Sequence, residues 1–216
     1  MLNGIDWQST LYSLPGILFG LTVHEYCHAL CALKLGDTTA RDQGRVTLNP
    51  LKHIDIFGFI FIIIAGFGWA KPVLFDPERL RNYRRDKALI ASAGPLSNMI
   101  LGLILVFCVK GLLFLFDNDG ISLSLFALAR HIYFILFYAA FINFGLFIFN
   151  LLPIPPLDGS HIVFSGLNLK PEVEEKIRKI GMPLLIIIIL VQNNTKISIL
   201  PIGNIVMAIM DFFLPT

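Results

Sequence analysis

Long apolar stretches alternate with short polar segments along this chain. Leu11 to Leu35, Ala88 to Phe116 and Leu123 to Leu152 are each long enough for a membrane-crossing helix, which needs about 20 mostly apolar residues. Ile54 to Phe67 is strongly apolar but short for a full span. We predict three spanning helices, with a re-entrant or steeply tilted segment between the first and the second.

The polar connections differ in composition. Asp37 to Pro50 mixes threonine, valine, glycine and charged residues, which favours a short membrane-associated β-hairpin. Trp69 to Arg85 is predicted to be a loop, because two prolines interrupt regular structure there. The acidic turn Asp117 to Gly120 connects the second and third spans.

The last quarter of the chain has a different pattern. Lys170 to Lys179 interleaves glutamates with basic residues, as an exposed helix start does, and Ile180 to Val191 and Ile197 to Leu214 are apolar. We predict an all-α polytopic membrane protein with about five to six transmembrane or re-entrant helices. Residues 1–165 form its core, and residues 166–216 form a cytoplasmic helix start and a peripheral C-terminal membrane hairpin.

Composition supports the membrane assignment. Of the 216 residues, 56% are hydrophobic and only 15% are charged, and a soluble domain could not cover so much apolar surface. The net charge of +2 is too small to indicate a nucleic-acid partner. Cys27, Cys31 and Cys108 all lie in apolar segments, so we interpret them as small membrane-buried residues and not as disulfide partners.

Basic residues predict the orientation of the spans. No lysine or arginine precedes the first span, whereas Lys34, Arg41, Arg45 and Lys52 follow its apolar part, and six more basic residues lie between Lys71 and Lys87. Positive charge accumulates on the cytoplasmic side of membrane proteins, so the N-terminus should lie outside and both basic segments inside.

Three residues in the interior of the first span indicate chemistry. His24 and His28 are four residues apart and therefore lie on one helix face, where both imidazoles can bind one metal ion. Glu25 points about 100° away and can reach a water on that metal without becoming a ligand. A charged side chain near the bilayer centre costs about 2.5–3.5 kcal/mol, which favours a metal site over a structural role for these groups.

A catalytic zinc takes three protein ligands and keeps one open position, so a third ligand is needed. Asp158 follows a proline-rich segment after the third span, where it could instead cap the next helix. Cys31 competes for the same role, since it follows His28 by three residues, but its short thiol lies too far along the helix. We therefore expect Asp158 to be the ligand, with Cys31 as the alternative.

Asn98 near the start of the second span allows two interpretations. Its side chain could bind another helix, or it could donate a hydrogen bond to a carbonyl oxygen that gains negative charge in a transition state. His53 could line the site or lie at the membrane interface, and the sequence does not decide its role.

Together these motifs resemble the site-2 protease family of intramembrane zinc metalloproteases. The resemblance rests on His-Glu-x-x-His at 24–28, Gly-Pro-x-x-Asn at 94–98 and Asn-x-x-Pro-x-Pro-x-Leu-Asp-Gly at 150–159. The runs Gly68 to Val73 and Arg45 to Pro50 are similar to the compact bacterial and archaeal branch. No insertion between the motifs is large enough for a PDZ domain, and no nucleotide-binding domain is expected after them.

This resemblance implies specific roles. His24, His28 and Asp158 would be the ligands of Zn²⁺, Glu25 the general base, and Asn98 and Asn150 substrate-binding residues. The protein would be a zinc metalloendopeptidase of a prokaryotic cell membrane. It would cut transmembrane proteins or peptides within the lipid bilayer, close to the cytoplasmic face.

Two other functions remain open at this point. A membrane metallohydrolase that is not a protease, such as a lipid hydrolase, would use the same ligands, and a non-catalytic scaffold would bind substrates without cutting them. The presence of Glu25 argues against the scaffold, because a protein that only binds substrates has little need of a base beside the metal. The sequence does not identify the substrate, and it leaves open whether the protein is a homo-oligomer.

Overall fold

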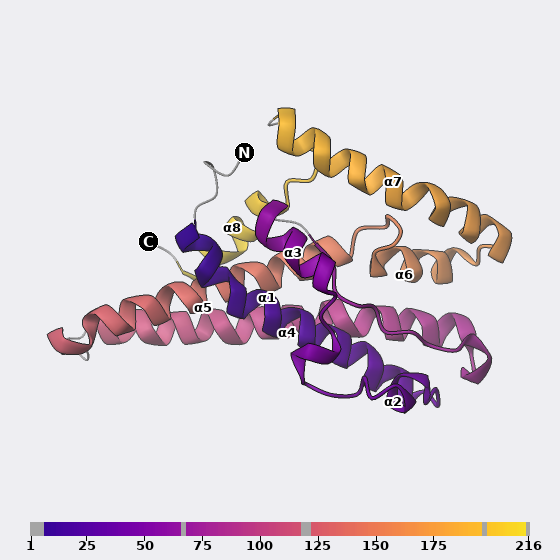
Figure 1. The fold of residues 1–216 in the computed structure, drawn as a ribbon, viewed down its shortest axis with the longest axis horizontal. Helices are drawn as coiled ribbons and strands as arrows, with labels where there is room; N and C mark the ends of the chain where they lie inside the picture. The colour runs from indigo at the N-terminus through magenta and orange to yellow at the C-terminus, as the bar shows by residue number, and fades with distance from the viewer. Residues whose placement is uncertain (1–6, 66–67, 118–121, 196–197, 215–216) are drawn as a thin grey trace.

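Three long helices form the body of the molecule (Figure 1). The computed structural model describes residues 7–65, 68–117, 122–195 and 198–214. In this part, α1 (Trp7–Lys34), α4 (Tyr83–Asp117) and α5 (Leu123–Asn150) each pack against the other two. They are the three described helices that are long and apolar enough to cross a membrane. The predicted all-α polytopic fold is therefore confirmed in outline.

Small residues allow the long helices to approach each other closely. A side chain at Gly16 of α1 would overlap Ala139 of α5, and one at Gly102 of α4 would lie 3.0 Å from the Phe144 ring. Helices in lipid gain little from the hydrophobic effect, so such close van der Waals packing contributes much of their association. The contact between α1 and α5 holds the helix that carries the metal motif.

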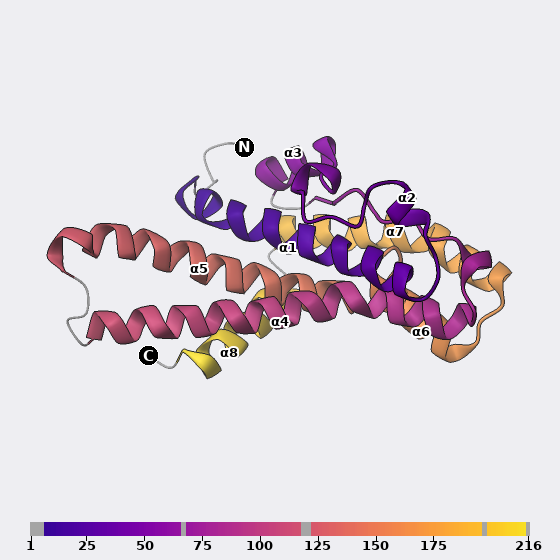
Figure 2. The ribbon, with the colours of Figure 1, turned by 90° about the horizontal axis from the view of Figure 1, so that it is seen from below.

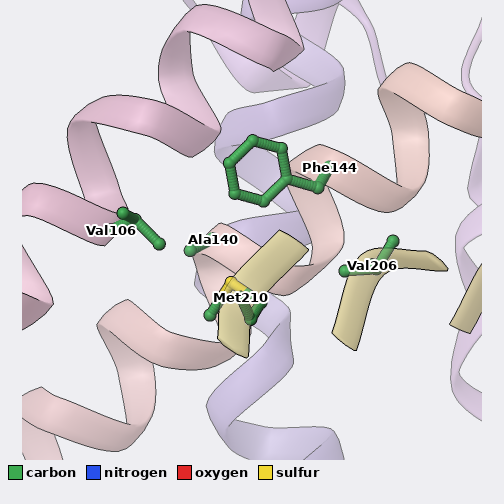
Figure 3. Close-up of a cluster of buried hydrophobic side chains, with 5 residues drawn as sticks. All are labelled: Val106, Ala140, Phe144, Val206 and Met210. Carbon is green, nitrogen blue, oxygen red and sulfur yellow. The ribbon is translucent and has the colours of Figure 1, made fainter. Parts of the chain in front are cut away.

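An apolar core lies where α4 and α5 meet the last described helix (Figure 3). Val106 of α4, Ala140 and Phe144 of α5, and Val206 and Met210 of α8 (Ile202–Phe213) are all buried there. The last helix of the chain is thereby fixed against α4 and α5. Figure 2 shows α8 beneath the crossing of these two helices.

The predicted β-hairpin at 37–50 is wrong. This segment, which the structure describes throughout, contains the single turn α2 (Thr39–Asp42) and the start of the 3₁₀ turn η2 (Pro50–Lys52). Its backbone forms local turn bonds instead of a ladder, such as those from the Asp42 amide to the Thr38 carbonyl and from the Arg45 amide to the Ala40 carbonyl, both over 2.8 Å. Its side chains bond to other segments: the Asp37 carboxylate accepts from the Asp76 amide, and Arg45 donates to the carbonyls of Lys52 and Lys71. Among the described residues, β pairing is limited to an isolated antiparallel bridge between Ile54 and Ala70.

The short apolar segment forms α3 (Ile56–Ala65), whose ten residues extend for about 15 Å, half of a bilayer core. This length agrees with a segment that does not cross the membrane. The predicted end of this segment, residues 66–67, lies outside the described residues, as does the predicted external turn after Asp117. A second 3₁₀ turn, η3 (Pro77–Arg79), lies in the loop before α4.

Two more helices follow α5. The helix α6 (Asp158–Leu167) begins directly at the proposed third ligand, and α7 (Pro171–Thr195) joins the charged segment and the following apolar segment into one 25-residue helix. Buried Lys87 of α4 forms an ion pair with Glu174 of α7, with 2.6 Å between Nζ and Oε2. In Figure 1, α6 and α7 lie on the same side of the long helices.

Candidate metal centre

The helix α1 places His24, Glu25 and His28 in the interior of the protein. All three side chains are buried, with relative exposures of 5%, 8% and 7%. The four-residue spacing turns both imidazoles to the same side, and their Nε2 atoms are 2.9 Å apart. The sequence therefore places two candidate metal ligands within one turn of a single helix.

Asp158 joins the two histidines from the start of α6. Its Oδ2 atom lies 3.1 Å from Nε2 of His24 and 3.3 Å from Nε2 of His28. The helix α5 ends at Asn150, and the chain then turns through a proline-rich segment. Gly159 packs against the carbonyl of Leu151 so closely that no side chain would fit. This contact fixes the position of the aspartate next to it.

Hydrogen bonds on the far side of each imidazole set its orientation. His24 Nδ1 lies 2.6 Å from Oδ1 of Asn98, and His28 Nδ1 lies 2.7 Å from the carbonyl oxygen of Ile90. The Ile90 carbonyl oxygen can only accept a hydrogen bond. Asn98 Oδ1 is also an acceptor, because the amide nitrogen of Asn98 donates to Gly20 O and to Asn143 Oδ1. Each histidine therefore carries its proton on Nδ1, and its Nε2 lone pair points into the site.

This arrangement fits a zinc ion. Two imidazole lone pairs and a carboxylate oxygen converge within 4.8 Å of one another, and without a cation they would repel. Ligand atoms about 2.0–2.1 Å from a tetrahedral zinc are about 3.3 Å apart, close to the three separations found here. Three protein ligands of this kind leave one coordination position for water or substrate.

Glu25 lies beside the three candidate ligands but is not part of their group. Its Oε2 atom accepts a hydrogen bond of 3.0 Å from the backbone amide of Val73. Val73 belongs to the connection between α3 and α4, which runs without helix from Gly68 to Asp76. The same connection is tied to the loop after α1, since the Lys71 amide donates to the His53 carbonyl over 2.8 Å. The glutamate is thus held by a neighbouring segment while its other oxygen remains for chemistry.

A cavity of about 400 Å³ surrounds these groups. Residues of α1, α4, α5, α6 and α7 and of the connection from Gly68 to Phe75 line it. Most of the lining is apolar, and its polar members besides the metal motif include Lys87, Asn150 and His161. Such a concave, mostly apolar space with a few convergent polar groups is typical of a binding site.

The two predicted asparagines lie in different places. Asn150, the last residue of α5, lines the cavity, and its amide nitrogen donates to the Leu146 carbonyl over 3.0 Å. Asn98 is fully buried behind His24 and is not among the residues that line the cavity. The carboxamide of Asn98 holds His24. The position of Asn98 therefore favours a role in orienting His24 over contact with a substrate.

Cys31 and His53 lie away from the three ligands. Cys31 packs against an apolar cluster formed by Ala32, Leu80 and Ile90, and it is not part of the ligand group found among the described residues. His53 is buried in a separate small cavity, and its Nε2 donates to the Thr47 carbonyl over 2.8 Å. Burial lowers the pKa of His53, so its imidazole is neutral at neutral pH.

Sequence reasoning missed the role of Gly94. A side chain there would lie 2.6 Å from Nε2 of His24 and would also overlap the ring of His28. The imidazoles can reach each other only because this turn of α4 has no Cβ atom. The Gly-Pro-x-x-Asn motif contains this glycine and was the sequence signal for it. Its role in making room for the imidazoles becomes visible only from the packing of α4 on α1.

The fold and the site define a membrane-embedded metallohydrolase with a His-Glu-x-x-His motif. The model of peptidase family M50 matches residues 12–192 of the chain. The chain therefore belongs to this family of intramembrane zinc metalloproteases, and the resemblance to the site-2 protease family is confirmed. Its cofactor is zinc.

Curated relatives agree with this assignment. The chain is 42% identical over 153 residues to the candidate zinc metalloprotease YwhC of Bacillus subtilis (strain 168), a match that covers 70% of this chain and 67% of YwhC. It is 30% identical over 166 residues to the candidate zinc metalloprotease Rip2 of Mycolicibacterium smegmatis, covering 74% of this chain and 58% of Rip2. The Rip2 protein of Mycobacterium tuberculosis is 29% identical over 168 residues, again with 74% of this chain and 58% of Rip2 covered. No solved structure matches the chain significantly.

Proposed function

We propose that this protein hydrolyses peptide bonds in or near transmembrane segments of membrane proteins, close to the cytoplasmic face of a prokaryotic cell membrane. In this proposal His24, His28 and Asp158 bind the zinc, and Glu25 is the general base. The observation that carries it is the convergence of three candidate metal ligands: His24 and His28 lie inside a helix long enough to cross a bilayer, with Glu25 beside them, and Asp158 reaches them from α6.

The residues around the metal have distinct tasks. Zinc bound by these ligands would acidify a water molecule and polarise the substrate carbonyl. Glu25 takes a proton on Oε1 while Val73 holds Oε2, and it can return that proton to the leaving amine. The buried position of Glu25 keeps its carboxylate in place for both transfers.

The two asparagines support different steps. Asn98 holds His24 in the tautomer whose Nε2 can bind a metal, and Asn143 and Gly20 hold Asn98 in turn. We therefore assign Asn98 to positioning of a ligand. Asn150 lines the cavity at the end of α5, where its amide can contact a substrate backbone.

A substrate helix must unwind before its peptide bonds can reach the site, because helical backbone groups are already paired. The connection from Trp69 to Phe75 lines the cavity without forming a helix. The amides of Lys71 and Val73 already bond to His53 and Glu25, so we infer that the remaining backbone groups of this connection bind an extended substrate segment, the mode by which strand edges bind peptides.

The charges support a site near the cytoplasmic face. His28 lies six residues before Lys34, the end of α1, which corresponds to about 9 Å along the helix. Basic residues follow that end, and more lie in the loop that leads to α4. By the positive-inside rule this end of the bundle is cytoplasmic.

A peptide-cleavage assay tests the proposal. Purified protein in liposomes is given a quenched fluorescent peptide that carries one apolar transmembrane sequence, and a lipid ester is given in a parallel sample. We expect cleavage of the peptide alone, its loss with a zinc chelator, and its return when zinc is added. Hydrolysis of the lipid ester without peptide cleavage would identify a lipid hydrolase instead.

A further inference from the structure

His161 shares one face of α6 with the metal ligand Asp158. The two residues are three positions apart, a spacing that places side chains next to each other on a helix. Both line the large cavity. His161 therefore stands one helical turn from the metal site and faces the same space.

The start of α6 is held firmly. Gly159 packs against the Leu151 carbonyl, and the Ser160 hydroxyl donates to the Leu157 carbonyl over 2.7 Å. Because Asp158 and His161 belong to the same helical turn, the backbone fixes where the two residues stand relative to each other.

The Nδ1 atom of His161 is buried and lacks a hydrogen-bond partner among the described residues. Charged groups from three elements surround the imidazole, namely Lys87, Asp158, Glu174 and Arg178. Each of these is already engaged elsewhere: Lys87 and Arg178 lie 2.6 Å and 3.6 Å from Glu174, and Asp158 lies against His24 and His28.

Buried polar atoms without a partner are rare in native proteins, and each one calls for an explanation. Since Nδ1 is inaccessible, the opposite edge of the ring, with Nε2, is the part that can meet a ligand in the cavity. Burial and the nearby cations Lys87 and Arg178 lower the pKa of His161, so the neutral imidazole carries one N–H donor.

We infer that His161 is a catalytic residue whose imidazole Nε2–H donates a hydrogen bond to the carbonyl oxygen of the peptide bond being cut. The inference rests on the proposed proteolytic function. Negative charge accumulates on that oxygen when the carbonyl is attacked, and a donor fixed on α6 stabilises it without moving. His161 keeps its proton throughout and is therefore distinct in role from Glu25.

Variants of α6 test this inference. We expect His161→Ala to lower kcat for the transmembrane peptide by about 10²–10³-fold, as loss of one such donor does, with little change in KM. The amide of His161→Gln still offers an N–H near the same place and should restore part of the activity. Ser165→Ala is the matched control, because Ser165 also has a buried unpaired atom on α6 but does not line the cavity.

Zinc content and the midpoint of thermal unfolding are measured for every variant. The inference predicts that both stay at the wild-type values in His161→Ala and His161→Gln. A His161→Ala enzyme with wild-type kcat would overturn it, and so would a loss of activity that follows a loss of zinc. If the wild type does not cut the peptide at all, the proposed function fails; an active wild type with an active His161→Ala removes only this inference.

Discussion

Oδ1 of Asn98 lies 2.6 Å from Nδ1 of His24, although the two residues are 74 positions apart in the chain. The contact joins α4 to α1 at the metal site. Because Asn98 is itself held by Gly20 and Asn143, its carboxamide has one orientation, and so has the imidazole. The same Asn98 side chain thus makes a helix-packing contact and sets the tautomer of His24, a proposed metal ligand.

Removing that side chain should weaken metal binding. We expect Asn98→Ala to lower zinc affinity by about 10–100-fold, the usual effect of losing a hydrogen bond to a metal-bound histidine. Zinc titration against a chromogenic chelator measures the change. Asn150→Ala serves as the control: it lines the cavity without touching either histidine, so its zinc affinity should stay at the wild-type value.

Gly94 should tolerate no side chain. Gly94→Ala would push a methyl group against both imidazoles, so we expect zinc affinity and proteolysis to fall by at least about 10-fold. Gly111→Ala lies on the same helix with no atom within 4 Å of the new methyl group, and it should leave both unchanged. Equal behaviour of the two variants in zinc titration would contradict the described packing of α4 on the ligands.

The identity of the third ligand can be tested by exchange. Asp158→Asn removes a charged ligand atom, and we expect a large loss of both bound zinc and activity. Cys31→Ser should change neither, because Cys31 packs in the apolar cluster with Ala32 and Leu80. Zinc content measured by elemental analysis decides between them, and the opposite pattern would assign the ligand role to the thiol.

The sequence defines the metal motif well because its geometry is local. Two histidines four residues apart lie on the same face of a helix in any fold. Long apolar runs predict membrane spans without reference to tertiary structure. Asp158 is more remote, but its place after a proline-rich segment at the end of the third span indicated a return to the same depth. These expectations required no knowledge of how the helices pack.

Other features depend on contacts that no local pattern reveals. The segment 37–50 has strand-like composition, yet Arg45 and Asp37 bond backbone groups of distant segments and a hairpin does not form. Gly94 and the Ile90 carbonyl support the histidines only because α4 packs against α1. The sequence likewise does not show that His161 lines a cavity and that its Nδ1 lacks a hydrogen-bond partner among the described residues.

Sidedness follows from the charges and can be measured in intact cells. Single cysteines are placed at Gln43 and at Asp117, both exposed, on a background with the three native cysteines replaced by serine. We expect a membrane-impermeant thiol reagent to label position 117 and to spare position 43. Labelling of position 43 alone would invert the topology and move the cleavage products to the other side of the membrane.

The central claim is that Glu25 serves as the base beside a zinc ion that His24, His28 and Asp158 hold. Glu25→Gln keeps the size of the side chain but cannot accept a proton. Cleavage of the transmembrane peptide and zinc content, measured on the same purified samples, test the claim most directly. We predict a loss of cleavage of at least about 10²–10⁴-fold with zinc content unchanged. Near-normal cleavage by Glu25→Gln would contradict the account.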